Sequence, residues 1–222
     1  MPALIALLTG EWPFGVSLAL SYLLGSVPFG WLMARLIRGV DIRTVGSGNI
    51  GSTNAMRVLG KPLGAVAFLL DFGKGFAPAY LIGLTEGGDS TRMVLCGAAA
   101  VVGHVWPIFL RFKGGKAVAT GLGAIVAIDP VVALCAFALW FAVLMCTRFV
   151  ALASLAMGVT FPIAAYLRMG GRFYGWDFVA GTSVLCILIL IRHRTNISRM
   201  LAGEEGRSRM GFGGKQKESN DG

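Results

Sequence analysis

The stretch Val45–Arg57, VGSGNIGSTNAMR, is the segment around which the rest of the chain is organised. It combines glycines, asparagines and hydroxyl side chains, ends in an arginine and contains no acid. Glycine allows backbone N–H groups to approach a ligand closely, and successive N–H groups in such a turn can form an anion-binding nest. A flexible surface linker is the plain alternative for this composition. A second cluster of similar chemistry, Phe112–Lys116 (FKGGK), favours phosphate binding over the linker.

The composition outside these loops is that of a membrane protein. Of the 222 residues, 55% are hydrophobic and only 14% are charged, and the mean hydropathy is +0.72. A soluble domain would carry about 25% charged residues. We therefore expect one transmembrane domain over residues 1–205 and a polar, disordered cytoplasmic tail over 206–222. The net charge of +9 suits anionic lipid or anionic substrates. Nucleic acid is excluded as a partner, because no basic face is interleaved with aromatic residues.

Apolar segments long enough to approach the roughly 20 residues of a spanning helix recur along the chain. They predict an all-α polytopic bundle of about seven transmembrane helices, some of them short or broken. Five crossings remain an alternative if the short segment stopped by Asp129-Pro130 is re-entrant. The expected segments are 16–37, 58–84, 93–111, 116–128, 131–146, 149–167 and 177–191.

The distribution of Lys and Arg among the loops predicts the orientation, because cytoplasmic loops are enriched in both. With this bias the N-terminus lies outside, the C-terminus lies in the cytoplasm, and both glycine-rich loops face the cytoplasm. The residues expected on the cytoplasmic side are Arg35, Arg38, Arg43, Arg57, Lys61, Arg111, Lys113, Lys116, Arg148, Arg192 and Arg194. The opposite side is expected to carry Glu11, Glu86, Asp89, Arg92, Asp129, Arg168, Arg172 and Asp177.

Two polar features interrupt the apolar segments. Pro28, within Ser26–Gly30, predicts either a simple helix kink or a turn that lines a site. Asp71 and Lys74 are spaced to pair on one helix face. The alternative is that glycines break the helix near Lys74 and direct this side chain toward the cytoplasmic loops, since ionisable residues in a membrane indicate function by default.

Polar residues also gather near the second loop and after the last apolar segment. Lys113 and Lys116 flank Gly114-Gly115, so charges and glycine amides could hold a phosphate together. His104 lies upstream, with either a structural or a direct role. His193 and Asn196 are expected to share one helix face, a feature that a basic stop sequence alone does not explain.

The reaction chemistry is limited by what the sequence lacks. Neither His104 nor His193 has an acid five residues later, which excludes the acyl-CoA-dependent acyltransferases that use this pair. The sequence has no nucleophile elbow and no acidic cluster for Mg²⁺, and its four cysteines are interpreted as buried apolar residues. We expect no metal, no cofactor and no covalent intermediate, and therefore a substrate that is already activated.

These motifs together resemble the bacterial acyl-phosphate:glycerol-3-phosphate acyltransferase family of integral membrane enzymes. The resemblance runs in order from about residue 16 to 205. Ser52 stands where the family usually has alanine, and Ala117 where it usually has glycine. The matching pieces are Gly25–Gly30, Asp41-Ile-Arg43, Gly46–Asn54, Arg57, Lys74-Gly75 with Pro78, Gly103-His104, Pro107, Phe112–Lys116, and His193–Asn196 through Glu204.

The resemblance implies an enzyme of phospholipid synthesis in the bacterial inner membrane, functionally linked to the enzyme that makes acyl phosphate. A fatty acyl group would pass from acyl phosphate to the 1-hydroxyl of sn-glycerol 3-phosphate, giving lysophosphatidic acid and phosphate. The expected catalytic residues are Ser26, Arg43, Asn49, His193 and Asn196. Glu204 is expected to support the site. The expected substrate-binding residues are Gly46, Ser47, Gly48, Gly51, Thr53, Asn54, Arg57, Lys74, His104, Lys113, Gly114, Gly115 and Lys116.

Three points stay open at this stage. The general base is a substrate phosphate, His193 or His104, and either loop could hold either phosphate. A transporter of an organic phosphate is the rival function, although transporters often show internal repeats that this chain lacks. A phosphotransferase acting on a nucleotide-activated lipid would need more carboxylates than Asp41 and Asp71 supply.

Overall fold

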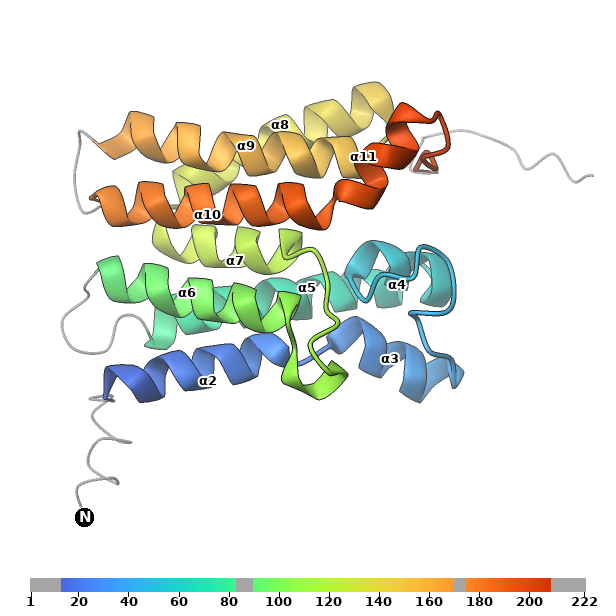
Figure 1. The fold of residues 1–222 in the computed structure, drawn as a ribbon, viewed down its shortest axis with the longest axis horizontal. Coiled ribbons are helices and arrows are strands. Elements are labelled where there is room, and N and C mark those ends of the chain that lie inside the picture. Colours follow the sequence, from blue (N-terminus) through green and yellow to red (C-terminus); the bar gives the residue numbers. More distant parts are fainter. Residues whose placement is uncertain (1–12, 83–89, 170–174, 209–222) are drawn as a thin grey trace, which may run out of the picture.

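The structure is a computed structural model that describes residues 13–82, 90–169 and 175–208. Over these ranges the chain is helical, without strands, as expected for the fold class (Figure 1). Glu11, Glu86, Asp89, Arg172 and the tail beyond 208 lie outside the described residues. The helices are α2 Phe14–Ser26, α3 Phe29–Arg38, α4 Ser52–Leu59, α5 Lys61–Ala77, α6 Ser90–Val105, α7 Val118–Ile128, α8 Pro130–Thr147, α9 Val150–Arg168, α10 Trp176–Arg192 and α11 Arg194–Leu201.

Among the described residues, four segments are long and apolar enough to cross a membrane: Phe14–Arg38, Ser90–Leu110, Pro130–Thr147 and Val150–Arg168. A fifth is added if α10 and α11, which meet at a 53° bend, count as one span. Helix α7 has 11 residues and is therefore about 16 Å long, roughly half of a 30 Å hydrocarbon core. The number of seven crossings thus stays a prediction, as does the orientation of the termini.

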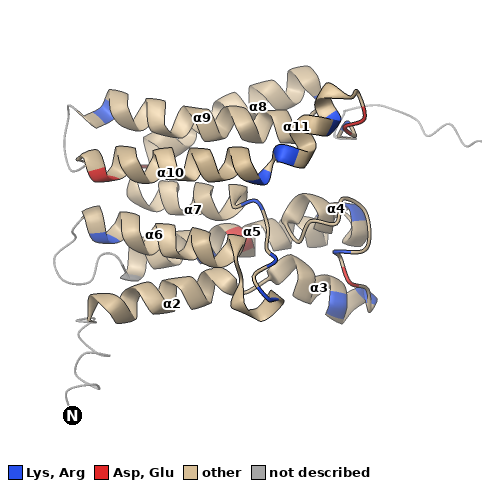
Figure 2. Ribbon diagram, viewed as in Figure 1, with Lys and Arg blue, Asp and Glu red and all other residues tan. Residues whose placement is uncertain are grey.

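The polar loops gather at one end of the molecule. Figure 1 places the α3–α4 loop, the loop before α7 and helix α11 in the right-hand half, whereas the turn between α7 and α8 lies at the left. Figure 2 shows that most Lys and Arg residues lie at the right-hand end as well. The two glycine-rich loops and the basic segment after α10 are therefore neighbours in space, as the sequence predicted.

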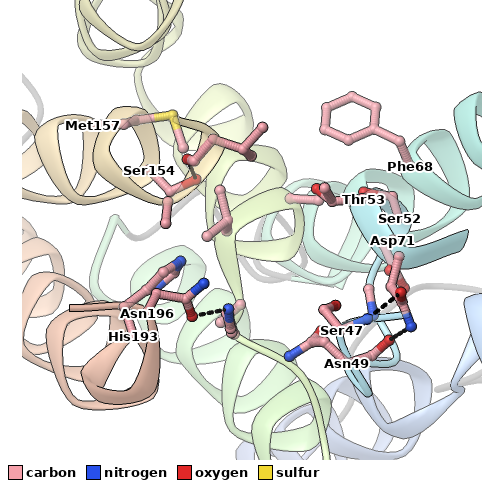
Figure 3. Close-up of a pocket in the computed structure, with 18 of the residues that line it drawn as sticks. Ser47, Asn49, Ser52, Thr53, Phe68, Asp71, Ser154, Met157, His193 and Asn196 are labelled. Carbon is pink, nitrogen blue, oxygen red and sulfur yellow. Dashed lines mark hydrogen bonds between the residues drawn. The ribbon is translucent and has the colours of Figure 1, made fainter. Parts of the chain in front are cut away.

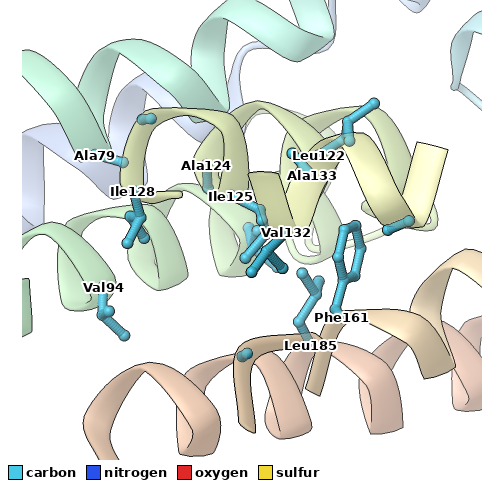
Figure 4. Packing of buried hydrophobic residues seen from close by; sticks show 14 of the residues in the cluster. Ala79, Val94, Leu122, Ala124, Ile125, Ile128, Val132, Ala133, Phe161 and Leu185 are labelled. Carbon is cyan, nitrogen blue, oxygen red and sulfur yellow. The ribbon is translucent and has the colours of Figure 1, made fainter. Parts of the chain in front are cut away.

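Helix α7 lies at the centre of the bundle, where small residues let backbones approach (Figure 4). A Cβ at Gly75 of α5 would lie 1.9 Å from the carbonyl oxygen of Thr120, and one at Gly123 would lie 2.0 Å from that of Phe72. Helices α5 and α7 are thus in close contact along their length. Phe161 of α9 and Leu185 of α10 cover the other side of α7.

The break at Pro28 separates α2 from α3. Val27 is extended, with φ −63° and ψ 116°, and Pro28 has no N–H to donate. Helix α5, in contrast, continues without a break past Lys74 to Ala77 and then into a π-helical turn over Pro78–Ile82. The predicted break near Lys74 is therefore wrong, and Asp71 and Lys74 do pair on one face of a continuous helix, 2.7 Å apart.

Candidate active site

A cavity of about 310 Å³ lies where the polar loops meet the bundle (Figure 3). One part of its wall is polar and comes from the α3–α4 loop, α4, the loop before α7 and the α10–α11 junction. The polar and charged lining residues are Ser47, Asn49, Gly51, Ser52, Thr53, Asn54, Arg57, Asp71, His104, Lys116, Ser154, His193, Asn196, Arg199 and Glu205. The other part is apolar and comes largely from α5, α7, α8 and α9, through Met56, Phe68, Ala117, Val118, Ala119, Leu122, Phe137, Trp140, Val150, Ala151 and Met157.

Asn54 organises the first glycine-rich loop. Its side chain is buried, donates from Nδ2 to the carbonyls of Ile42 and Asn49, both at 2.9 Å, and accepts from the N–H of Ser47 at 2.9 Å. Gly46 has φ +63°, and a Cβ there would lie 2.2 Å from Asn54 Oδ1. Asn54 borders the cavity, but its hydrogen bonds are used within the loop. It therefore shapes the loop, and the substrate-binding role predicted for it stays a prediction.

Asn49 presents a donor to the cavity. Its Oδ1 accepts the N–H of Gly51 at 2.9 Å, which leaves its Nδ2 group directed into the cavity in Figure 3. Ser47 borders the same space, and α4 begins immediately afterwards with Ser52 and Thr53 on the wall. The N-terminus of a helix carries a partial positive charge. This side of the cavity is therefore suited to an anion.

Ser26 and Arg43, two of the predicted catalytic residues, do not line the cavity. Ser26 is buried and its hydroxyl donates to the carbonyl of Tyr22 at 2.8 Å. Arg43 pairs with Asp41 at 2.6 Å and holds the pKa of that carboxyl well below its usual range. Asp41 thus neutralises the charge of Arg43 locally. The arginine of this region that lines the cavity is Arg57.

The second loop is held in place through its own glycines. The N–H of Gly115 donates to the carbonyl of His104 at 3.0 Å, and the N–H of Gly114 donates to that of Val105 at 3.1 Å. These amides are therefore not available to cradle a phosphate, contrary to the expectation from FKGGK. The glycines are needed because a Cβ at Gly115 would lie 2.1 Å from His104 Nε2. Lys113 is exposed and does not line the cavity, so Lys116 is the lysine that the loop presents.

Lys116 meets the residues that follow α10. Its Nζ donates to Asn196 Oδ1, and Asn196 Nδ2 donates to Glu205 Oε1 at 2.6 Å. Glu205 also pairs with Arg199 at 2.8 Å. The support predicted for Glu204 therefore comes from its neighbour, because Glu204 is exposed. The pKa of Lys116 is lowered to about 8, mainly by burial; the charges of Arg199, Arg57 and Arg192 also lower it, whereas Glu205 raises it.

His193 lines the cavity together with Asn196, as their spacing predicted. Its Nδ1 lies 2.9 Å from the carbonyl of Ile189. A proton on Nδ1 satisfies this contact and leaves Nε2 as an acceptor. His193 can therefore accept a proton from a group bound in the cavity.

Deeper in the protein, His104 and Asp71 border the cavity but are almost fully buried. His104 Nδ1 lies 3.9 Å from Asp71 Oδ1. Lys74, predicted to bind substrate, is buried behind them and does not line the cavity.

Sequence reasoning missed the apolar wall and five polar lining residues, which are Ser52, Asp71, Ser154, Arg199 and Glu205. Helix α8 is apolar on all sides, so nothing in its sequence marks Phe137 and Trp140 as cavity residues. The arrangement as a whole joins anion-binding groups to an apolar wall that can hold a hydrocarbon chain.

Comparisons with known proteins agree with this geometry. Residues 15–203 match the model of a family described as glycerol-3-phosphate acyltransferase. A protein of that name from Aquifex aeolicus is 46% identical over 187 residues, 84% of this chain and 95% of the relative. One from Desulforudis audaxviator is 45% identical over 190 residues, 86% and 93% of the two chains.

Two solved structures of PlsY, an integral membrane glycerol 3-phosphate acyltransferase, are similar to this fold at 42% identity. The glycerol 3-phosphate form has a TM-score of 0.80 and covers 90% of this chain and 96% of that one. The lysophosphatidic acid form has a TM-score of 0.78, with 87% and 94% covered.

Proposed function

This chain belongs to the glycerol-3-phosphate acyltransferase family, and on that premise we propose that it acylates the 1-hydroxyl of sn-glycerol 3-phosphate. The acyl donor in this proposal is acyl phosphate, and the products are lysophosphatidic acid and inorganic phosphate. The observation that carries the proposal is the cavity, in which cations and amide donors adjoin a wall of apolar side chains. Two phosphate-bearing substrates suit the polar part, and a fatty acyl chain suits the apolar part.

The transfer proceeds by direct attack. The 1-hydroxyl oxygen bonds to the acyl carbon, the bond from that carbon to the phosphate oxygen breaks, and the phosphate leaves with the electron pair. Negative charge develops on the carbonyl oxygen and on the leaving phosphate. Arg57 and Lys116 are the cations placed to stabilise it, with Asn49 as a neutral donor. Since a mixed anhydride is already activated, this route uses neither a metal nor an acyl-enzyme.

Two groups can accept the hydroxyl proton. A substrate phosphate has a second pKa near 6, and His193, whose Nδ1 contacts the Ile189 carbonyl, lines the cavity. A His193→Gln variant separates these routes. A loss of 10²- to 10⁴-fold in kcat, with an unchanged KM for glycerol 3-phosphate, assigns the base to His193. A smaller loss assigns it to the phosphate.

Purified protein supplied with palmitoyl phosphate and labelled glycerol 3-phosphate tests the proposal. EDTA is present throughout, and palmitoyl-CoA replaces the donor in a parallel reaction. Lysophosphatidic acid from palmitoyl phosphate alone is the expected result. Product from the CoA ester alone would contradict the proposal that acyl phosphate is the donor. If a folded, monodisperse sample gave no product from either donor, the proposed acyl transfer would be wrong and transport of an organic phosphate would be favoured.

The absence of a covalent intermediate has its own test. An acyl-enzyme would exchange labelled inorganic phosphate into acyl phosphate without any glycerol 3-phosphate present. Direct transfer predicts no exchange above the rate seen without protein. In the cell, the enzyme would lie in the bacterial inner membrane with its cavity open to the cytoplasm, where the enzyme that makes acyl phosphate supplies the donor.

A further inference from the structure

We propose that Lys74 is a positioning residue that joins the break between α2 and α3 to the loop carrying Lys116. The inference rests on the proposed function for its kinetic test and on geometry alone for its structural test. Lys74 is 3% exposed and lies outside the cavity, so it acts on the site through other groups.

The first contact is at the break itself. Lys74 Nζ donates to the carbonyl of Val27 at 2.7 Å. Because Val27 is extended and Pro28 interrupts the helix, this carbonyl is not fully used in a regular helical hydrogen-bond pattern. The ammonium group also lies 5.6 Å from the ring centroid of Phe29, the first residue of α3. Lys74 therefore fixes the direction in which α3 leaves the break, and α3 carries the first glycine-rich loop.

The second contact leads to the other loop. Lys74 pairs with Asp71 at 2.7 Å, and Asp71 Oδ1 lies 3.9 Å from His104 Nδ1. The carbonyl of His104 accepts the N–H of Gly115 at 3.0 Å, and the His104 ring packs against Gly115, next to Lys116. One buried side chain thus has a path to each of the two loops that make the polar part of the cavity.

An ordinary buried ion pair is the alternative explanation of these contacts. Such a pair can often be replaced by neutral residues at little cost, whereas removal of one partner leaves an uncompensated charge. The two roles make different predictions for the double variant Asp71→Asn/Lys74→Met. This variant has no unpaired charge, yet the Val27 carbonyl loses the ammonium donor and keeps the N–H of Phe29 at 3.2 Å.

Pulsed electron paramagnetic resonance tests the position of α3 without reference to catalysis. Spin labels at Leu36→Cys in α3 and Leu201→Cys in α11 occupy exposed positions, at 81% and 85%. Cys135 and Cys146, which are exposed and not buried as the sequence predicted, are replaced by alanine. We expect one narrow distance distribution in the reference protein and in Lys61→Met, an exposed lysine on the same helix. Lys74→Met and the double variant are expected to broaden it, and an unchanged distribution in both would overturn the proposal.

Kinetics then test whether the position matters. For Lys74→Met and the double variant we expect kcat for acyl transfer to fall about 10- to 100-fold, with both KM values within threefold. A selective rise in the KM for one substrate would mean that Lys74 binds that substrate. Full activity in the double variant would mean that Lys74 serves only as the partner of Asp71 in a buried ion pair. Failure of both variants to fold would assign Lys74 to folding. Each of these three results contradicts the proposal, whereas absence of activity in the unmodified protein would instead contradict the function.

Discussion

At the scale of single residues, Ala117 holds a backbone conformation that costs an alanine energy. It precedes α7 with φ +62° and lies next to Lys116. The left-handed conformation costs a residue with a Cβ roughly 1–2 kcal/mol. The family that the sequence resembles usually has glycine here, so this chain tolerates strain beside its cavity.

Ala117→Gly is therefore expected to stabilise the protein. The relief of about 1 kcal/mol corresponds to an increase of about 2–4 °C in the apparent Tm for a chain of this size. Ala119→Gly, within α7, is the matched control and should lower the Tm, because glycine weakens a helix interior. Thermal unfolding in one detergent measures the Tm of both variants. A lower Tm for Ala117→Gly would contradict the claim that the backbone at Ala117 is strained.

Lys116 predicts a pH dependence. Its pKa of about 8 means that the ammonium is charged below this pH and neutral above it. The kcat/KM for acyl transfer should therefore fall as the pH increases through 8, measured from pH 7 to 9.5, where the phosphate of glycerol 3-phosphate is already a dianion. Lys116→Arg stays charged over this range. An equal fall in kcat/KM for the arginine variant would show that another group titrates.

The residues that sequence reasoning placed correctly are those whose neighbours are also polar and near in sequence. Asn49, Arg57, His193 and Asn196 line the cavity as expected. Arg43 pairs with Asp41 and does not line the cavity, and its catalytic role stays a prediction. The amides of FKGGK are used within the protein, contrary to the expectation that they hold a phosphate. Their acceptors belong to the end of α6, and only the fold reveals that contact.

At the scale of helices, the close contact between α5 and α7 depends on glycines, and Gly75 of α5 can be compared with a neighbour on the same helix. A Cβ at Gly75 would lie 1.9 Å from the Thr120 carbonyl, whereas one at Gly73, on the same helix, would meet nothing within 4 Å. Gly75→Ala should force the helices apart and destabilise the protein by about 1–3 kcal/mol. Gly73→Ala should be neutral or stabilising by up to about 1 kcal/mol. Unfolding curves of equal midpoint would contradict the close contact.

The sequence predicted the helical class and most segments, but it left open whether α5 is continuous. Glycines around Lys74 suggested a break, yet α5 continues because Gly75 and Gly123 lie at its contact with α7. Glycine can therefore mark close packing as well as flexibility. The break at Pro28 was predictable, since proline removes a donor.

At the scale of the whole molecule, the clustering of Lys and Arg at one end predicts that this end faces the cytoplasm. A cysteine at Thr44, in the loop after α3, should react with an impermeant thiol reagent only from the cytoplasmic side. A cysteine at Trp176, exposed at the start of α10, should react only from outside. Both are tested in intact cells and in inverted vesicles after replacement of Cys135 and Cys146. The reverse pattern would contradict the orientation.

The most direct test of the cavity as the acyl-transfer site compares three single variants. Acyl transfer from palmitoyl phosphate to glycerol 3-phosphate is measured for Lys116→Ala, Arg57→Ala and Lys113→Ala. The first two remove cations from the cavity, and the third removes an exposed lysine from the same loop as Lys116. We predict that kcat/KM falls about 10- to 100-fold for the first two and stays within threefold for Lys113→Ala. Full activity in Lys116→Ala, or an equal loss in Lys113→Ala, would contradict the assignment of the site.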